Sequence, residues 1–291
     1  MVSPASDQPT TRQLDSLGQS VWLDYIQRSI LTSGRLATMV RDGWVTGMTT
    51  NPTIFEKALA ESADYEASLR AVAATGDVKP YDAFLSLAIE DIRGAAAALR
   101  PVYERTAKVD GFVSLEEPPG IEFDTAASVA EGKRLFDLAG EPNVMIKVPG
   151  TPAGIEALEA LIAEGVNVNV TLLFAVGAYE QVAEGYLRGL EARHARGLDL
   201  SRVASVASFF VSRVDTAVDA QLPADSPLRG TIAVADISTT MTSYLLTIET
   251  KTGDIPSLLT DAGLTITGLD QFYVAGAPRP YGAISIGTAT V

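Results

Sequence analysis

Short apolar runs alternate along this chain with longer stretches in which apolar residues recur at helical spacing. Runs of roughly four to eight apolar residues are typical of buried strands, and longer periodic stretches are typical of helices. The predicted strands are Val21–Asp24, Val45–Thr50, Gly111–Glu116, Val144–Val148, Val166–Thr171, Ala204–Phe210, Phe272–Ala275 and, with a weaker pattern, Ala283–Gly287. The predicted helices are Tyr25–Arg41, Ile54–Ala74, Tyr81–Tyr103, Ala126–Ala139, Ala153–Glu164, Ala175–Arg196 and Thr231–Thr250.

The repeated order of strand and then helix favours a parallel sheet with right-handed crossovers. Eight such units within 291 residues predict a (β/α)8 TIM barrel of the α/β class. An open doubly wound sheet is the alternative, but residues 24–27 read DYIQ where a dinucleotide-binding sheet carries a glycine-rich turn. Because no linker rich in Pro, Gly or Ser divides the chain, we expect one barrel domain over residues 19–291, after a flexible lead-in at 1–18.

Composition excludes several classes of function. A net charge of −14 without a basic stretch argues against nucleic-acid and anionic-membrane partners. The chain has no cysteine, which excludes disulfides and cysteine-ligated zinc, and its one histidine, His194, lies at a polar helix end. A Ser-His-Asp triad and a multi-histidine metal site are therefore not expected. The polar N-terminus and the lack of any apolar run near the ~20 residues needed to span a bilayer predict a cytoplasmic protein.

Lys147 is the lysine that does not fit its surroundings. It is one of six lysines and lies inside the predicted buried strand Val144–Val148, whereas the other five lie in polar or helical surroundings. Burial disfavours the charged form of an amine and leaves a nucleophile that can attack a carbonyl group. The alternative is a strand-end lysine that snorkels to solvent or pairs with a carboxylate.

Polar residues follow one predicted strand after another at the carboxyl end, which is where a (β/α)8 barrel carries its active site. They are Asp24, Thr50, Asn51, Glu116, Lys147, Asn169, Thr171, Ser208 and Arg213. Each also has a structural interpretation: a helix cap, a turn, a polar layer inside the barrel or a surface position. As a set they suit amine catalysis, because an amine nucleophile needs carboxylates and hydroxyls to move protons, and an arginine can hold a phosphate.

Six motifs together resemble the transaldolase family, and most closely its longer, actinobacterial-type branch. They are VWLD from residue 21, TTNPTIF from 49, GFVSLE from 111, MIKVP from 145, NVNVTLLF from 167 and SVASFFVSR from 205. The resemblance runs in order from about residue 20 to about residue 235. It implies a (β/α)8 barrel and a class I mechanism that uses no metal and no cofactor.

The resemblance also implies a role for each matched residue. Lys147 would form a Schiff base with a ketose phosphate, Asp24 would transfer the proton for carbon–carbon cleavage, and Glu116 and Thr171 would position water. Asn51 and Asn169 would hold donor hydroxyls or the lysine itself, and Ser208 and Arg213 would bind the sugar phosphate. Thr50, beside Asn51, and Arg279, outside the matched motifs, are further candidates for substrate binding. A dihydroxyacetone unit would pass to an aldose phosphate such as erythrose 4-phosphate. The implied partners are thus sugar phosphates, with the protein a monomer or a homodimer.

The chain departs from the family pattern near the predicted seventh strand. The family carries a segment like WASTxTK there, whereas residues 271–279 read QFYVAGAPR, so that Arg279 is the one cation available in that segment. The chain ends at Val291, where the family continues into a helical region, and residues from about 236 onward diverge. Three hypotheses remain open: a transaldolase of the pentose phosphate pathway, a related enzyme with an altered substrate in specialised metabolism, and a non-catalytic barrel with a degraded phosphate site.

Overall fold

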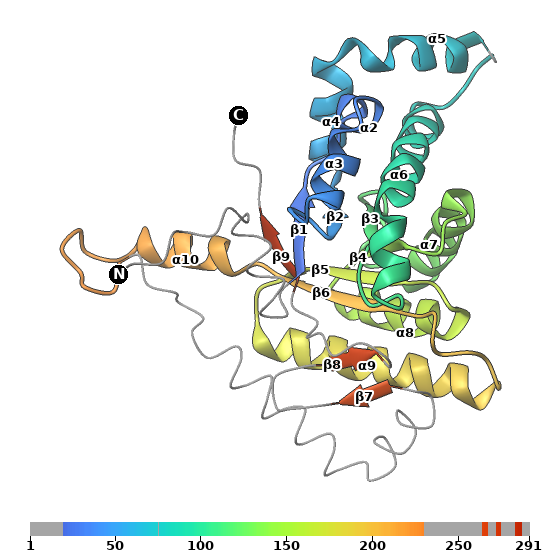
Figure 1. The fold of residues 1–291 in the computed structure, drawn as a ribbon. Coiled ribbons are helices and arrows are strands. Elements are labelled where there is room, and N and C mark those ends of the chain that lie inside the picture. Colours follow the sequence, from blue (N-terminus) through green and yellow to red (C-terminus); the bar gives the residue numbers. More distant parts are fainter. Residues whose placement is uncertain (1–19, 75, 230–263, 267–271, 275–282, 287–291) are drawn as a thin grey trace, which may run out of the picture. The chain divides into compact units, whose positions relative to one another are not determined.

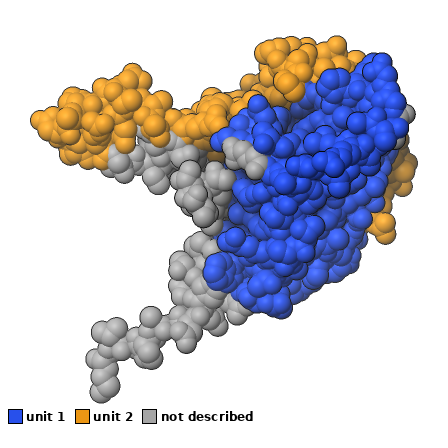
Figure 2. Space-filling model, turned by 90° about the horizontal axis from the view of Figure 1, so that it is seen from above, with its two compact units in different colours: residues 1–118, 134–146, 276–291 blue, residues 119–133, 147–275 orange. Residues whose placement is uncertain are grey.

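The computed structural model describes residues 20–74, 76–229, 264–266, 272–274 and 283–286 of the chain (Figure 1). The predicted lead-in at 1–18, the predicted helix Thr231–Thr250 and the candidate ligand Arg279 lie outside these residues. The chain divides into two compact units, coloured separately in Figure 2. Unit 1 comprises residues 1–118, 134–146 and 276–291, and unit 2 comprises residues 119–133 and 147–275.

The sheet of unit 1 has the strand order β9-β1-β2-β3-β4. Its strands are β1 (Ser20–Asp24), β2 (Gly47–Thr49), β3 (Val113–Glu116), β9 (Ala283–Ile286) and the first three residues of β4 (Val144–Pro149). β1 pairs in parallel with both β2 and β9, and β2 pairs in parallel with β3. The predicted eighth strand therefore lies beside the first, which is the pairing that a closed (β/α)8 barrel requires.

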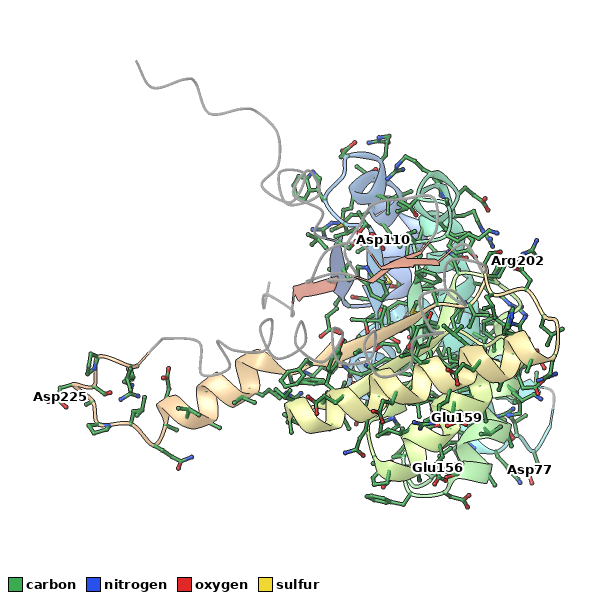
Figure 3. All side chains as sticks on the ribbon, turned by 90° about the horizontal axis from the view of Figure 1, so that it is seen from below. Asp77, Asp110, Glu156, Glu159, Arg202 and Asp225 are labelled. Carbon is green, nitrogen blue, oxygen red and sulfur yellow. The ribbon has the colours of Figure 1, made fainter. Side chains whose placement is uncertain are left out.

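Trp22 of β1 determines the packing at the amino-terminal end of this sheet. Its partner in register is Gly47, where an added Cβ would lie 2.4 Å from the indole nitrogen. The indole N–H donates to Oδ1 of Asp110 at 3.0 Å, and Asp110, labelled in Figure 3, is 2% exposed. A glycine is thus needed opposite the tryptophan, because any larger residue would occupy the space of the ring.

The helices of unit 1 are shorter and more numerous than the sequence pattern predicts. The predicted helix Tyr25–Arg41 is two helices, α2 (Arg28–Thr32) and α3 (Arg35–Arg41), separated at Gly34, where φ is 73°. This left-handed conformation ends a helix and is one that glycine adopts without steric cost.

A second predicted helix, Ile54–Ala74, is divided into α4 (Pro52–Glu61), the 3₁₀ turn η1 (Ala63–Tyr65) and α5 (Glu66–Ala74). The break falls at Ser62, whose backbone is extended and whose hydroxyl accepts from the backbone N–H of Asp64 at 3.1 Å. Serine competes for backbone hydrogen bonds in this way, so it favours a new helix start over continuation.

One long helix, α6 (Pro80–Arg105), confirms the predicted helix Tyr81–Tyr103. A buried network ties α6 to α2 and η1: Asp91 accepts from Nε of Arg28 at 2.8 Å and from the hydroxyl of Tyr65 at 2.7 Å. The guanidinium of Arg28 also lies 4.6 Å from the centre of the Tyr65 ring. Burial raises the pKa of both Tyr65 and Asp91 in this network, so its ion pair holds the three elements together at a desolvation cost.

Unit 2 contains the last three residues of β4, followed by β5 (Val168–Leu173) and β6 (Ser205–Phe209), in the order β4-β5-β6. β5 and β6 pair in parallel. The helices are α8 (Pro152–Glu164), α9 (Val176–Ala195) and α10 (Val211–Asp219), while α7 (Thr125–Ala139) has residues in both units. The predictions for α7, α8 and α9 are confirmed within a residue at each end, whereas α10 was not predicted.

Helices α8 and α9 pack closely side by side (Figure 1). An added Cβ on Gly189 of α9 would lie 2.7 Å from the carbonyl oxygen of Glu159 and 2.8 Å from Cβ of Ile162. Arg188 of α9 pairs with the carboxylate of Glu159, which is labelled in Figure 3, at 2.7 Å, and both side chains are partly exposed. The glycine lets the two backbones approach, and the ion pair lies at the rim of their interface.

The predicted seventh strand is present as β8 (Phe272–Val274), but among the described residues its partner is β7 (Leu264–Ile266). The two strands pair antiparallel in a two-stranded sheet. Two strands so close in sequence pair antiparallel through a short connection, whereas parallel pairing needs a crossover. The remaining strands are parallel and alternate with helices, which confirms the α/β class.

Candidate active site

Lys147 lies in β4, a strand buried along its whole length. Its side chain is 6% exposed, and its neighbours Ile146 and Val148 are fully buried. The strand is followed by Gly150 and by Thr151, whose hydroxyl caps α8 by accepting from the backbone N–H of Gly154 at 3.0 Å. The expected burial of this lysine is confirmed, and the alternative in which it snorkels to solvent is wrong.

The polar residues of β5 are buried on one face of the strand. Asn167, just before the strand, and Asn169 and Thr171 within it are each 1% exposed and are spaced by two along the chain. Oδ1 of Asn167 accepts from the backbone N–H of Ala204 at 3.0 Å, and Oδ1 of Asn169 accepts from the hydroxyl of Ser208 at 2.7 Å. These bonds join β5 to the β6 segment, so both asparagines have a structural role between neighbouring strands. Substrate binding by Asn169 and Ser208 stays a prediction.

Arg213 follows β6 as predicted and lies on α10 with an exposed side chain. Its guanidinium lies 4.9 Å from the centre of the Phe210 ring, and that ring stacks on Phe174 at 5.3 Å. A cation over an aromatic face keeps its charge available on the side away from the ring. The arrangement suits an anion ligand, and phosphate binding by Arg213 stays a prediction. The two phenylalanines were not singled out from the sequence.

Unit 1 carries the two predicted catalytic carboxylates. Asp24 is the last residue of β1 and Glu116 is the last residue of β3, and both are half-buried. Because β1, β2 and β3 are parallel neighbours, their carboxyl ends lie at one edge of the sheet. The structure therefore brings these two acids to the same edge of unit 1, as the sequence predicts.

Thr50 and Asn51 have structural roles of their own at the end of β2. The hydroxyl of Thr50 is fully buried and donates to the carbonyl oxygen of Ser114 at 2.7 Å. Oδ1 of Asn51 accepts from the backbone N–H of Ile54 at 3.0 Å and caps α4, with Pro52 at the first helical position. The interpretation as a turn before a helix is confirmed, and substrate binding by either residue stays a prediction.

The two units carry different kinds of reactive group. Unit 2 carries a buried amine with amide and hydroxyl neighbours along β5 and β6, and unit 1 carries two carboxylates at a sheet edge. Amine nucleophile, proton-transfer carboxylates and hydroxyls are what a Schiff-base mechanism requires. Among the described residues, no three or more His, Asp or Glu side chains are grouped to hold a metal ion. No helix in the described part of the chain combines the length and apolar character needed to cross a bilayer.

Comparison with known proteins assigns the chain to a family. The family model described as Transaldolase/Fructose-6-phosphate aldolase matches residues 21–257. Proteins named Transaldolase 2 are 49% identical over 256 residues in Nostoc punctiforme and 48% identical over 212 residues in a Nostoc species. A protein named Transaldolase from Thermobifida fusca is 47% identical over 238 residues. The matched family folds as a (β/α)8 barrel, which confirms the predicted fold class.

Each match covers a larger share of this chain than of the relative. They include 82%, 73% and 80% of this chain but only 66%, 55% and 64% of the Nostoc punctiforme, Nostoc species and Thermobifida fusca proteins. The chain therefore spans between about half and two thirds of the length of these relatives. The family match also continues to residue 257, beyond residue 235, where the recognisable sequence motifs end.

Proposed function

Because the chain belongs to the transaldolase/fructose-6-phosphate aldolase family, we propose that it is a transaldolase, a transferase of dihydroxyacetone units. It takes the unit from a ketose phosphate and gives it to an aldose phosphate, in the cytoplasm and within the pentose phosphate pathway. Lys147 holds the unit as a Schiff base between the two half-reactions. The proposal needs neither a metal ion nor a cofactor.

In this proposal each catalytic residue has a separate role. Nζ of Lys147 adds to the ketone carbon, and loss of water from the carbinolamine gives the imine. Asp24 accepts the proton of the donor hydroxyl as the adjacent carbon–carbon bond breaks, so the aldehyde leaves and the bonding electrons form an enamine. The enamine attacks the acceptor aldehyde while Asp24 returns the proton, and water held by Glu116 and Thr171 hydrolyses the product imine.

The observation that carries the proposal is the burial of Lys147 in a central strand beside a strand of buried amide and hydroxyl side chains. An amine 6% exposed in an apolar strand has lost most of its hydration, and buried ionisable groups of this kind are frequent at functional sites. The same short stretch of the chain lies within the matched family region. Asn51, Thr50, Asn169, Ser208, Arg213 and Arg279 complete the proposed substrate-binding set.

Trapping with borohydride tests the proposal directly. Incubation with fructose 6-phosphate and borohydride should leave a three-carbon adduct on Lys147, identified by peptide mass spectrometry. Lys147→Ala should abolish the adduct and lower transaldolase turnover by at least about a thousandfold. Lys133→Ala is the matched control, because Lys133 is a half-exposed lysine that pairs with Glu164 at 3.7 Å. An adduct on another lysine, or none on the wild-type chain, would contradict the proposal.

An altered substrate is the second candidate, favoured by the segment at residues 271–279, which lacks the serine of the family pattern. Turnover measured with a panel of ketoses, with and without a phosphate group, distinguishes the transaldolase from the enzyme with an altered substrate. Turnover of fructose 6-phosphate with erythrose 4-phosphate near the common enzyme rate of about 10 per second excludes the altered substrate. Faster turnover of an unphosphorylated or longer sugar favours it.

A further inference from the structure

Strand β5 contains one residue more than its partner at the carboxyl end. Val170 is in register with Ala207 and Leu173 with Phe209, so Thr171 and Leu172 together face the single residue Ser208. Two residues opposite one define a β-bulge, which is rare between parallel strands. The bulge therefore lies at Thr171, the residue that the proposed function assigns to water positioning.

The extra residue has an unfavourable backbone. Leu172 has a φ of 62°, in the left-handed region, where the Cβ of an L-residue lies too close to the following carbonyl oxygen. Its side chain is 45% exposed, while Thr171 and Leu173 on either side are buried. Burial of the leucine therefore does not explain the conformation, and the surrounding backbone must hold it.

Both neighbouring segments hold the bulge in place. The carbonyl oxygen of Leu173 accepts from the backbone N–H of Phe210 at 2.8 Å, beyond the end of β6. The carbonyl oxygen of Thr171 accepts from the backbone N–H of Gly150 at 2.8 Å, just after β4. A Cβ on Gly150 would lie 2.4 Å from Cδ2 of Leu173, so a larger residue there would have to displace the end of the leucine side chain. Thr171 is thereby fixed to the segment that begins with Lys147.

We propose that Leu172 is a positioning residue, whose left-handed backbone turns the end of β5 so that Thr171 is held against the β4 segment carrying Lys147. The inference rests on the proposed function, in which Thr171 serves the Schiff base of Lys147. The backbone conformation carries the effect, and the leucine side chain does not. A residue that tolerates positive φ should therefore preserve the site better than an isomer of leucine that does not.

Three variants test this. Leu172→Asn changes the chemistry of the side chain but tolerates positive φ, whereas Leu172→Ile keeps the composition and disfavours positive φ. Leu198→Ile is the matched control, because Leu198 is 38% exposed and lies outside the left-handed region. The measurement is the rate of reductive methylation of Lys147 by formaldehyde and cyanoborohydride, divided by that of Lys133 in the same molecule, with folding checked by circular dichroism.

Leu172→Ile should lower this ratio by about ten- to a hundredfold, the range that a misplaced catalytic group produces. Leu172→Asn and Leu198→Ile should stay near the wild-type ratio. Equal ratios for Leu172→Ile and wild type, or equal losses in Leu172→Ile and Leu172→Asn, overturn the inference. If Leu172→Ile does not fold, Gly150→Ala tests the same contact from the other strand, and a wild-type ratio there overturns it as well.

Formaldehyde makes the test independent of the sugar. The same variants are also trapped with fructose 6-phosphate and borohydride. If formaldehyde gives the expected pattern but the sugar gives no adduct on wild-type Lys147, the proposed function fails and the positioning role stands. If the sugar adduct forms equally fast in wild type and in Leu172→Ile, the positioning role fails and the proposed function stands.

Discussion

Asp110, three residues before β3, has a carboxyl group that is almost entirely buried. Its Oδ1 accepts from the indole of Trp22 at 3.0 Å and from the backbone N–H of Gly111 at 2.8 Å. Burial raises the pKa of Asp110 above the ordinary value, and the hydrogen bonds from Ser20, Thr46 and the two donors above oppose that rise only in part. The folded protein therefore holds this proton at pH values where the unfolded chain has already released it.

This raised pKa predicts how Asp110→Asn changes the pH dependence of stability. Between the ordinary pKa near 4 and the raised one, the folded state binds more protons than the unfolded state, so stability falls as pH rises. The amide oxygen of asparagine can accept the bonds from Trp22 and Gly111, and the asparagine side chain does not titrate. The variant should thus gain stability relative to wild type between pH 4 and pH 8, measured by urea unfolding.

The control for that prediction is Asp42→Asn, at a carboxylate with 45% side-chain exposure that pairs with Arg41. Its unfolding free energy should stay within about 0.5 kcal/mol of wild type across the same range. If the difference in unfolding free energy between Asp110→Asn and wild type does not change with pH, the raised pKa of Asp110 does not contribute to stability.

The sequence predicts the environment of a single residue well where that environment depends only on burial in an apolar run. Lys147 is recognisable because it interrupts an apolar run, and the structure buries it. The conformation of Leu172 is not recognisable, because it depends on the register between β5 and β6 and on the approach of Gly150. The hydrogen-bond partner of Ser208 cannot be predicted from the sequence for the same reason, because the bond to Asn169 joins residues 39 positions apart.

At the scale of elements, the contact between α8 and α9 depends on one glycine more than on helix propensity. Gly189→Ala improves the propensity of α9 but introduces a Cβ 2.7 Å from a backbone oxygen of α8, which cannot move as a side chain can. We expect the variant to lose about 1–3 kcal/mol of unfolding free energy, as overpacked contacts do. Urea unfolding followed by circular dichroism measures the loss.

Gly177→Ala on the same helix is the matched control, because no atom lies within 4 Å of its added Cβ. It should gain up to about 1 kcal/mol from helix propensity alone. If both variants gain stability, the close approach of α8 and α9 does not require glycine at residue 189, and the prediction is contradicted.

The periodicity of apolar residues predicts most helices and strands but not the positions where a helix is interrupted. Ser62 and Gly34 break predicted helices because their local backbone bonds and φ values outweigh an apolar pattern that continues through them. Pro101 lies inside α6, so the helix continues through a residue that usually ends one. For β8 the sequence predicts a strand correctly, but its antiparallel partner β7 was not predicted.

At the scale of the whole chain, two elements belong to both units. β4 contributes residues 144–146 to unit 1 and residues 147–149 to unit 2, and α7 crosses the same division at residue 134. The division is not visible in the sequence, because no linker marks it and β4 is a continuous apolar strand. The prediction of a single domain stays a prediction, and cooperativity of unfolding is the property that tests it.

Both tryptophans of the chain, Trp22 and Trp44, lie in unit 1, so tryptophan fluorescence reports on that unit alone. Because β4 and α7 cannot stay folded in one unit while the other unfolds, we expect a single cooperative transition. Gly189→Ala, which lies in unit 2, should then lower the urea midpoint seen by fluorescence as much as the midpoint seen by circular dichroism. The variant is best made in a Trp44→Phe background, since Trp22 is 4% exposed and Trp44 is 51% exposed. A fluorescence midpoint that Gly189→Ala leaves unchanged would instead show that unit 1 unfolds separately, despite the strand that it shares with unit 2.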